Sequence, residues 1–551
     1  MKILNKYKLN LLRILVLAIF AVLPLTGICA SADFLIFHTS DTHGAIAAHS
    51  DPTSKEENKP LMGGFSIFKN LLDKYRADQA FRNARILYFD SGDFFQGTPV
   101  VDRTKGAVMV DMMNRVGLNA TTIGNHEFDY GYENLKAQLQ NRKFPVICCN
   151  VFVKATGRLL PFAEPYRVFT HNGFKIGVIG FAAPETPSIS IAKNVKDVEF
   201  HDPAPIVEKL CKKLRSAGVD FIILLSHLGY DADLRFAEQT SGYDMILGGH
   251  SHTLLPQITR AGPSPVSIIH SGSSLEHTSA VRISLKKGEP AEIELKSHPL
   301  YLKEIDYNQD ILMVEEEYLR EIRQEMARVI GNNNVNLYRG VNGGDSPEGS
   351  LIADAMRKAA NADFAFINFG GIRQPLFKGK LTVESAFMVQ PFDNKLEILT
   401  LKGSEIYDLL EKSVSNDFVL MDQADKDYAM NHFNIRADGM KRVVGPDYGY
   451  LYPSNLHITF DPSKDRMNRI LKLEIPGQGE LDKKKEYKIA LNDFIANGGD
   501  GYKCLKEVAG REKTDILVRD ALINYIQELK TIETKPEKRI TNIKLNEESL
   551  D

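Results

Sequence analysis

From Asp33 to about Tyr301 the chain alternates between short apolar runs and amphipathic stretches. The apolar runs end in polar, glycine-rich turns and are DFLIFHTSDTHG, ARILYFDSGDFF, NATTIGNHEFDYG, VDFIILLSHLG and YDMILGGHSH. The stretches with apolar residues every three or four positions are FSIFKNLLDKYRAD, GAVMVDMMNRVG and PAPIVEKLCKKLRSAG. Such spacing predicts helices, and strands that alternate with helices predict a layered α/β domain over residues 33–305.

A long charged stretch, QDILMVEEEYLREIRQEMARVI, follows at residues 309–330. Its spacing predicts a helix that ends before Gly331. We expect the segment 306–333 to be a linker helix between two domains; a helix packed inside one domain is the alternative. Beyond it, residues 334–545 mix strand patterns such as LHITF and ILKLEI with helical ones such as SLIADAMRKAA. This region is expected to be a separate α+β domain.

Composition narrows the class of protein. The chain has 551 residues, which favours two or more domains. Its formal net charge is −3, and no long basic run occurs outside the N-terminus, which argues against a nucleic-acid partner.

The N-terminus has the pattern of a secretory signal peptide over residues 1–32. Basic residues come first, the apolar run 14–25 follows, and the sequence Ala30-Ser31-Ala32 gives a cleavage pattern that places the cut after Ala32. We therefore expect an exported protein, periplasmic or extracellular, with no membrane span after signal removal; a retained membrane anchor is the alternative. Four cysteines then remain, too few for a disulfide scaffold, and adjacent Cys148 and Cys149 are expected to be buried thiols.

Five loops that directly follow apolar runs carry residues of one chemical kind. They hold Asp41 and His43; Asp90 to Asp93; Asn125, His126, Glu127 and Asp129; Ser226 and His227; and His250 and His252. In a layered α/β fold the ends of such strands gather on one edge. Asp, Asn and His are ligands that suit borderline divalent ions such as zinc and manganese. One such loop alone would indicate little, but five in this order predict a metal centre.

The motifs SDTHG, DSGDFFQGTP, GNHEFDYG, SHLG and GGHSH, followed by NFGGIR and NDFIANGGDGY, resemble those of a known family. The sequence is similar to the calcineurin-like metallophosphoesterase superfamily, and within it to the two-domain 5'-nucleotidase family. That family includes the bacterial periplasmic UDP-sugar hydrolase/5'-nucleotidase and animal ecto-5'-nucleotidase. The resemblance covers nearly the whole chain after the leader. It implies an N-terminal domain with α/β/β/α layers, a linker helix and a C-terminal α+β substrate-binding domain.

The resemblance also implies the roles of the residues in these loops. Two divalent metal ions, zinc or manganese, would be bound, the first by Asp41, His43 and His252 and the second by Asn125, His227 and His250, with Asp93 bridging both. His126, oriented by Asp129, would face the phosphoryl group. Hydrolysis would proceed without a covalent intermediate on the protein.

The C-terminal domain would grip the substrate. By resemblance, Arg373 contacts it, Phe494 stacks on the base and Asp500 binds the ribose hydroxyls. The sequence departs from the family where a second stacking phenylalanine is expected, because Asn455 occupies that place. Tyr450 and Tyr452 are candidates to replace it. Phe369 also stands where the family usually has glycine, and Lys402 stands where some members have arginine.

The function implied is hydrolysis of nucleoside 5'-monophosphates by a secreted phosphohydrolase with a small-molecule nucleotide as its substrate. UDP-sugar hydrolysis and 2',3'-cyclic nucleotide phosphodiesterase activity at the same metals are alternatives. A non-catalytic surface-binding protein on the same scaffold is a more remote one. The oligomeric state is open.

Overall fold

Two β-sheets pack face to face in the N-terminal part of the computed structural model, which describes residues 31–51, 54, 59–340, 343–416, 418–420, 441–443 and 448–544. The strands of the first sheet lie in the order β18 (Glu292–Pro299), β17 (His277–Lys286), β1 (Ser31–Thr39), β4 (Arg85–Asp90), β5 (Ala120–Thr121), β6 (Val146–Ile147) and β9 (Ala163–Glu164). Those of the second lie in the order β10 (Tyr166–His171), β11 (Phe174–Ala182), β13 (Phe221–His227), β14 (Met245–Gly248), β16 (Val266–His270) and β15 (Thr259–Ala261).

The central strands of both sheets, such as β1 and β13, are largely apolar because both of their faces are covered. In β1, Phe34 and Ile36 belong to the core between the two sheets. Leu35 and Phe37, which point the other way, belong to the core under the outer helices. Since successive side chains of a strand point to opposite faces, burial on both sides requires a continuous apolar run.

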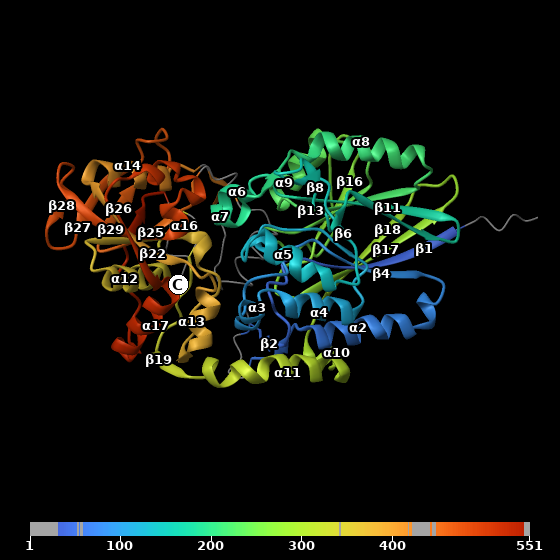
Figure 1. Ribbon diagram of the computed structural model, residues 1–551, viewed down its shortest axis with the longest axis horizontal. Helices are drawn as coiled ribbons and strands as arrows, with labels where there is room; N and C mark the ends of the chain where they lie inside the picture. Colours follow the sequence, from blue (N-terminus) through green and yellow to red (C-terminus); the bar gives the residue numbers. More distant parts are fainter. Residues whose placement is uncertain are drawn as a thin grey trace, which may run out of the picture.

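Helices cover the outer face of each sheet. On the first sheet lie α2 (Phe65–Ala77), α3 (Pro99–Thr104) and α4 (Ala107–Val116); on the second lie α8 (Pro203–Ser216) and α9 (Tyr230–Gln239) (Figure 1). The three helices expected from the sequence are those at α2, α4 and α8. The α/β/β/α order of layers is confirmed.

The predicted leader at 1–32 lies outside the described residues except for Ser31 and Ala32. These two residues begin β1, where Ala32 is buried and pairs with Leu285. The cleavage position stays a prediction. Cys148 and Cys149 are buried free thiols, as expected. Among the described residues, no helix combines the length and the apolar character needed to cross a lipid bilayer.

The long helix α11 (Gln309–Met326) packs on the N-terminal domain along its length. Ile311 and Ile322 join the core under α2, and the Glu315 carboxylate accepts bonds from the N–H and hydroxyl of Ser66, at 2.6 and 2.9 Å. The prediction of helix to residue 330 was wrong by four residues. Val329 to Asn333 form the strand β19, which pairs with β21 (Gly379–Thr382) and β31 (Thr531–Ile532) of the second domain.

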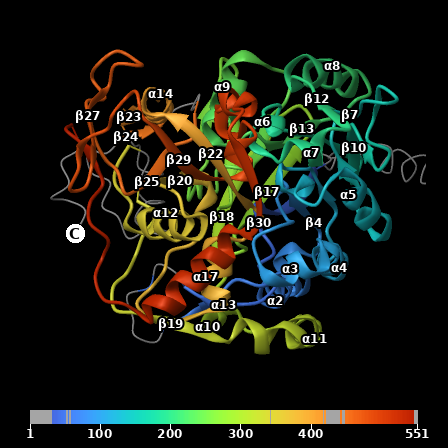
Figure 2. The same ribbon diagram turned by 60° about the vertical axis from the view of Figure 1, so that its left-hand side comes forward.

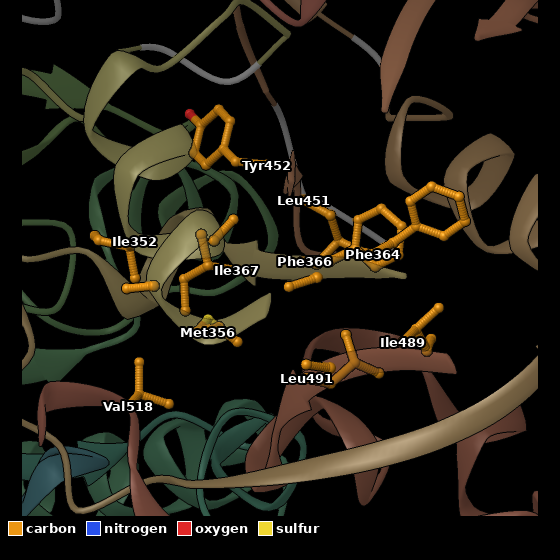
Figure 3. Packing of buried hydrophobic residues seen from close by; sticks show 14 of the residues in the cluster. Ile352, Met356, Phe364, Phe366, Ile367, Leu451, Tyr452, Ile489, Leu491 and Val518 are labelled. Carbon is orange, nitrogen blue, oxygen red and sulfur yellow. The ribbon is translucent and has the colours of Figure 1, made fainter. Parts of the chain in front are cut away.

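The second domain is built around a five-stranded sheet in the order β25 (Leu451–Ser454), β20 (Phe364–Asn368), β29 (Glu486–Asn492), β22 (Lys395–Lys402) and β30 (Arg511–Leu517). Helices α12 (Pro347–Ala360) and α17 (Val518–Leu529) pack on it, and their side chains meet those of β20 and β29 in one core (Figure 3). A smaller sheet contains β27 (Ile470–Ile475) and β26 (His457–Phe460). This arrangement is the predicted α+β domain.

The two domains lie side by side, with α11 running along one edge of the N-terminal domain towards the second domain (Figures 1 and 2). An ion pair crosses between them, with Lys105 Nζ 3.6 Å from Asp393 of the second domain. Met326, at the end of α11, packs against the cores of both domains.

Candidate active site

The five polar loops converge on one edge of the N-terminal domain. Strands β1, β4 and β5 run parallel in one sheet, and β13 and β14 run parallel in the other, so their carboxyl ends share that edge. In three groups of side chains the potential ligand atoms lie within 4.8 Å of one another: Asp41, His43 and His252; Asp93, His227 and His250; and His43, Asp93 and His126, which joins the other two. The structure therefore brings together the Asp and His residues that the sequence predicted as ligands.

The seventh predicted ligand, Asn125, is in the same place. Its Oδ1 atom is buried and has no hydrogen-bond partner among the described residues. The next residue, His126, donates its backbone N–H to Oδ1 of Asp93 at 2.9 Å, which fixes this loop against the loop that carries Asp93. A buried amide oxygen without a partner is costly unless a ligand binds it.

Five of the ligand candidates have backbone conformations that side chains rarely adopt. Asp41, His43, Asp93, His250 and His252 have φ between +44° and +75°. Each such residue costs on the order of 1–3 kcal/mol and persists only where its surroundings hold it. The loops are thus kept in strained shapes that aim their side chains at one point.

Glu127 holds two of these loops. One carboxylate oxygen accepts the N–H groups of Asp93 (2.8 Å) and Gly124 (2.6 Å), and the other accepts those of Phe94 (2.8 Å) and Phe95 (3.0 Å). Burial and the charge of Asp93 raise the pKa of Glu127 to about 7, against the opposing effect of the N–H donors. Glu127 stands in the motif GNHEFDYG, but no role for it was predicted from the sequence. Its place directly after Asn125 and His126 was the only signal.

Glycines allow the loops to approach one another. A Cβ atom on Gly124 would lie 2.1 Å from Oδ1 of Asp93 and 2.5 Å from Nε2 of His227. A Cβ on Gly249 would lie 3.1 Å from Oδ2 of Asp41. Only residues without a side chain fit so close to the ligand atoms.

The imidazoles are oriented for metal binding. Nδ1 of His227 lies 2.6 Å from the carbonyl oxygen of Ser91, and Nδ1 of His43 lies 3.3 Å from that of Gln96. These contacts leave each Nε2 facing the site, an orientation typical of metal-binding histidines. Nε2 of His227 is 3.0 Å from Oδ2 of Asp93 without a directed hydrogen bond, and Nε2 of His43 is 2.9 Å from Nε2 of His252.

The protonation states also fit a cation site. Burial lowers the pKa of His43 and His252 well below the usual range and that of His250 to about 3, so these rings are neutral, the form that binds metals. Burial acts the same way on His227, but the carboxylates of Asp93 and Asp41 outweigh it and raise its pKa to about 10. A cation bound between Asp93 and His227 would replace that proton. The donor set fits borderline divalent ions.

His126 and Asp129 form the predicted dyad. Nδ1 of His126 lies 2.7 Å from Oδ2 of Asp129. Burial lowers the pKa of His126, but the charges of Asp129 and Asp93 outweigh it, and the pKa lies above its ordinary value. The arrangement can hold a proton and present positive charge towards the pocket.

The predicted substrate residues of the second domain face the same pocket. A cavity of about 270 Å³ is lined by His126 and His250 from the N-terminal domain and by Arg373, Phe494 and Asp500 from the second. Arg373 reaches across to within 3.5 Å of Nε2 of His43.

Asp500 is buried within this pocket. Its Oδ2 atom accepts a hydrogen bond from the Asn368 amide at 2.8 Å. Burial raises the pKa of Asp500 to about 6, against the effect of that hydrogen bond.

The three residues considered for a second stacking face lie elsewhere, as does Lys402, which stands where some members of the family have arginine. Asn455 donates to the carbonyl oxygen of Asp363, and Lys402 is exposed at the start of α14 (Gly403–Ser413). Tyr450 and Tyr452 are buried in the domain core, where their rings meet edge to face with centroids 5.4 Å apart (Figure 3 shows Tyr452). None of the four lines the cavity.

Among the pocket residues to which the sequence gave no role are Phe392 and Asn368. The Phe392 ring stacks on the imidazole of His126, with centroids 5.9 Å apart and planes at 25°, and the Arg373 guanidinium lies 5.8 Å from the ring centroid. Asn368 holds Asp500. Phe392 stands in the polar turn QPFDNK, where no periodicity singles it out.

Comparison with known proteins gives two family matches. The calcineurin-like phosphoesterase model matches residues 34–254, and the model of the 5'-nucleotidase C-terminal domain matches residues 329–507. The solved structure of a 5'-nucleotidase precursor from Thermus thermophilus is 30% identical, with a TM-score of 0.81, and the match covers 93% of this chain and 100% of that one. The 5'-nucleotidase of Rattus norvegicus is 26% identical over 96% of this chain and 93% of its own. A 5'-nucleotidase-related protein of Glossina morsitans morsitans is 26% identical over 92% of this chain and 94% of its own.

Proposed function

Because the chain belongs to the two-domain 5'-nucleotidase family of calcineurin-like phosphoesterases, and is thus a metal-dependent phosphoester hydrolase, we propose that it is a 5'-nucleotidase. It hydrolyses nucleoside 5'-monophosphates to nucleoside and phosphate. The observation that carries the proposal is the shared cavity, in which metal-ligand candidates and the residues suited to a nucleoside face one another.

We assign the metal ligands as follows. Asp41, His43 and His252 would hold one divalent ion, Asn125, His227 and His250 would hold the other, and Asp93 would serve both. This assignment is supported by the grouping of these side chains and by the unpartnered Oδ1 of Asn125. Zinc or manganese suits the donor set. Two such ions supply Lewis-acid chemistry, which lowers the pKa of water and neutralises phosphoryl charge.

The protein's own groups bind and orient the substrate. His126, held by Asp129, donates a proton or hydrogen bond to the leaving oxygen as charge develops on it. Arg373 pairs with phosphate oxygens, Phe494 stacks on the base, and the Asp500 carboxylate accepts the ribose hydroxyls. We place the protein outside the cytoplasm, on the strength of the leader-like sequence at 1–32.

Chromatographic analysis of the products that the purified protein forms from AMP, UDP-glucose and 2',3'-cyclic AMP tests this function. Hydrolysis of AMP gives adenosine and phosphate, that of UDP-glucose gives UMP and glucose 1-phosphate, and that of the cyclic nucleotide gives an adenosine monophosphate. Each substrate is assayed with manganese or zinc, with EDTA, and with the variant His126→Ala. We expect metal-dependent release of phosphate from AMP, at a rate that falls by about 10²–10⁴-fold in the variant. No release from AMP by metal-loaded protein would overturn the proposal. Opening of 2',3'-cyclic AMP to an adenosine monophosphate, without hydrolysis of AMP, would reassign the chain as a phosphodiesterase.

A second candidate is hydrolysis of nucleotide diphosphate sugars. A groove of about 640 Å³, lined by His43 and His252 among the metal-ligand candidates, shares Gln96, His252, Arg373 and Pro391 with the cavity of about 270 Å³. It offers room for a group attached beyond the scissile phosphorus. Formation of UMP and glucose 1-phosphate from UDP-glucose in the same assay would support this candidate, whereas a non-catalytic scaffold would convert none of the substrates.

A further inference from the structure

A segment of the N-terminal domain forms part of the wall of the nucleoside cavity. Helix α6 (Thr186–Ile189) lies against the single turn Gly499–Gly501 of the second domain, and α7 (Ala192–Val195) follows it at the domain junction (Figure 1). Ile189, Ser190 and Ile191 line the cavity together with Phe494 and Asp500. Residues from both domains thus enclose the space available to a nucleoside.

Ser190 is the unusual member of this wall. Its side chain is 6% exposed, and its hydroxyl has no hydrogen-bond partner among the described residues. The neighbouring hydroxyls behave differently, since Thr186 donates to the carbonyl of Ala183 and Ser188 to that of Glu185, each at 2.7 Å. A buried hydroxyl without a partner is costly, and on a residue that lines a cavity a ligand that reaches it would complete its hydrogen bonding.

The wall is held in a fixed relation to the catalytic dyad. The Asn194 amide donates to the backbone carbonyl of Asp129 at 2.5 Å, and the Asn194 N–H donates to the carbonyl of Ile191 at 2.8 Å. The segment 189–191 is therefore anchored to the loop that carries His126. Such anchoring favours a positioning surface, because a bound group meets it without reordering the loop.

On the basis of the proposed function, we infer that residues 189–191 are the second wall of the base site. The nucleobase stacks on Phe494, the apolar side chains of Ile189 and Ile191 pack against it, and the Ser190 hydroxyl bonds to its polar edge. The ribose end already has its own polar pair, Asn368 and Asp500. This assignment also accounts for the absence of a second aromatic face from Asn455, since the opposite surface comes from the other domain.

Steady-state kinetics of Ser190→Ala with AMP, UMP and ribose 5-phosphate test the inference. Losing one hydrogen bond to the base raises KM for at least one nucleotide by about two- to tenfold and leaves kcat unchanged. Ribose 5-phosphate, which has no base, is unaffected. Ser190→Thr, which keeps the hydroxyl, restores the nucleotide KM. Ser188→Ala is the matched control, since it removes a hydroxyl from the same segment but outside the cavity.

The outcomes separate this inference from the proposed function. Equal effects on nucleotides and ribose 5-phosphate, or no change for any nucleotide, would overturn the base wall while leaving the nucleotidase. If the wild type hydrolyses none of the three, the proposed function fails. Calorimetric binding of adenosine then tests separately whether residues 189–191 bind the base. Weaker adenosine binding by Ser190→Ala than by Ser188→Ala would still support the wall. Equal binding, or no binding by either protein, would overturn it.

Discussion

Replacing Glu127 by glutamine changes one atom and removes half of the bonds that hold two ligand loops. An amide has one oxygen, so two of the four backbone N–H groups now face an NH2 group. The pair lost is either Asp93 and Gly124 or Phe94 and Phe95. Each buried N–H left without an acceptor costs about 1–3 kcal/mol, so Glu127→Gln destabilises the protein by roughly 2–6 kcal/mol.

Thermal unfolding at pH 8, where the carboxylate is ionised, measures this effect. Because 1 kcal/mol shifts the melting temperature of a domain of this size by about 2–4 °C, we expect a fall on the order of 5–20 °C. Manganese affinity falls too, since Asp93 and Asn125 sit on the loosened loops. Glu133→Gln makes the same chemical change on an exposed side chain and serves as the control. Matching melting temperatures and manganese affinities for the two variants would refute the idea that Glu127 orders these loops.

Three further predictions follow from the site. Gly124→Ala places a Cβ 2.1 Å from Oδ1 of Asp93, so we expect loss of bound metal and a fall in phosphate release of about 100-fold; normal metal content by elemental analysis would contradict this. Because protonated Asp500 accepts hydroxyls poorly, KM for AMP should rise as pH falls through about 6, whereas Asp500→Asn should show no such step. EDTA should lower the melting temperature, because an ion at a hundred times its Kd stabilises the fold by about 2.7 kcal/mol; an unchanged melting temperature would mean that no ion binds the folded state in preference.

Much of the fold could be predicted because burial leaves a clear mark on the sequence. Strands such as β1 are covered on both faces, so they appear as apolar runs, and the turn residues that follow them carry the ligand candidates. The end of α11 could not be predicted in the same way. Val329 and Ile330 continue the apolar spacing of the helix but pair as part of β19, and only the partner strands β21 and β31 decide between the two.

The metal-ligand half of the site could be predicted further than the nucleoside half. The ligand candidates are Asp, Asn and His residues that follow apolar strands, and these residue types can be recognised one by one in the sequence. Residues of many types can line a cavity if their shape fits. Phe392 in a polar turn and Ile189 in PSISI therefore could not be recognised as lining residues from the neighbouring sequence. Conversely, Tyr452 looked suited to stacking but is enclosed by the core of its own domain, which depends on contacts with distant residues such as Gly349.

The attachment of α11 determines where any rotation of one domain against the other must occur. Glu315 and Ile322 fix the helix to the N-terminal domain. The carbonyl oxygen of Arg328 accepts a hydrogen bond from the backbone N–H of Val383 in the second domain. The hinge of such a rotation is therefore the short stretch from Met326 to Arg328. Helix α11 stays fixed to the N-terminal domain during the rotation. A swing about that stretch would separate Arg373 from His43 and Lys105 from Asp393. The nucleoside cavity would then open between the domains.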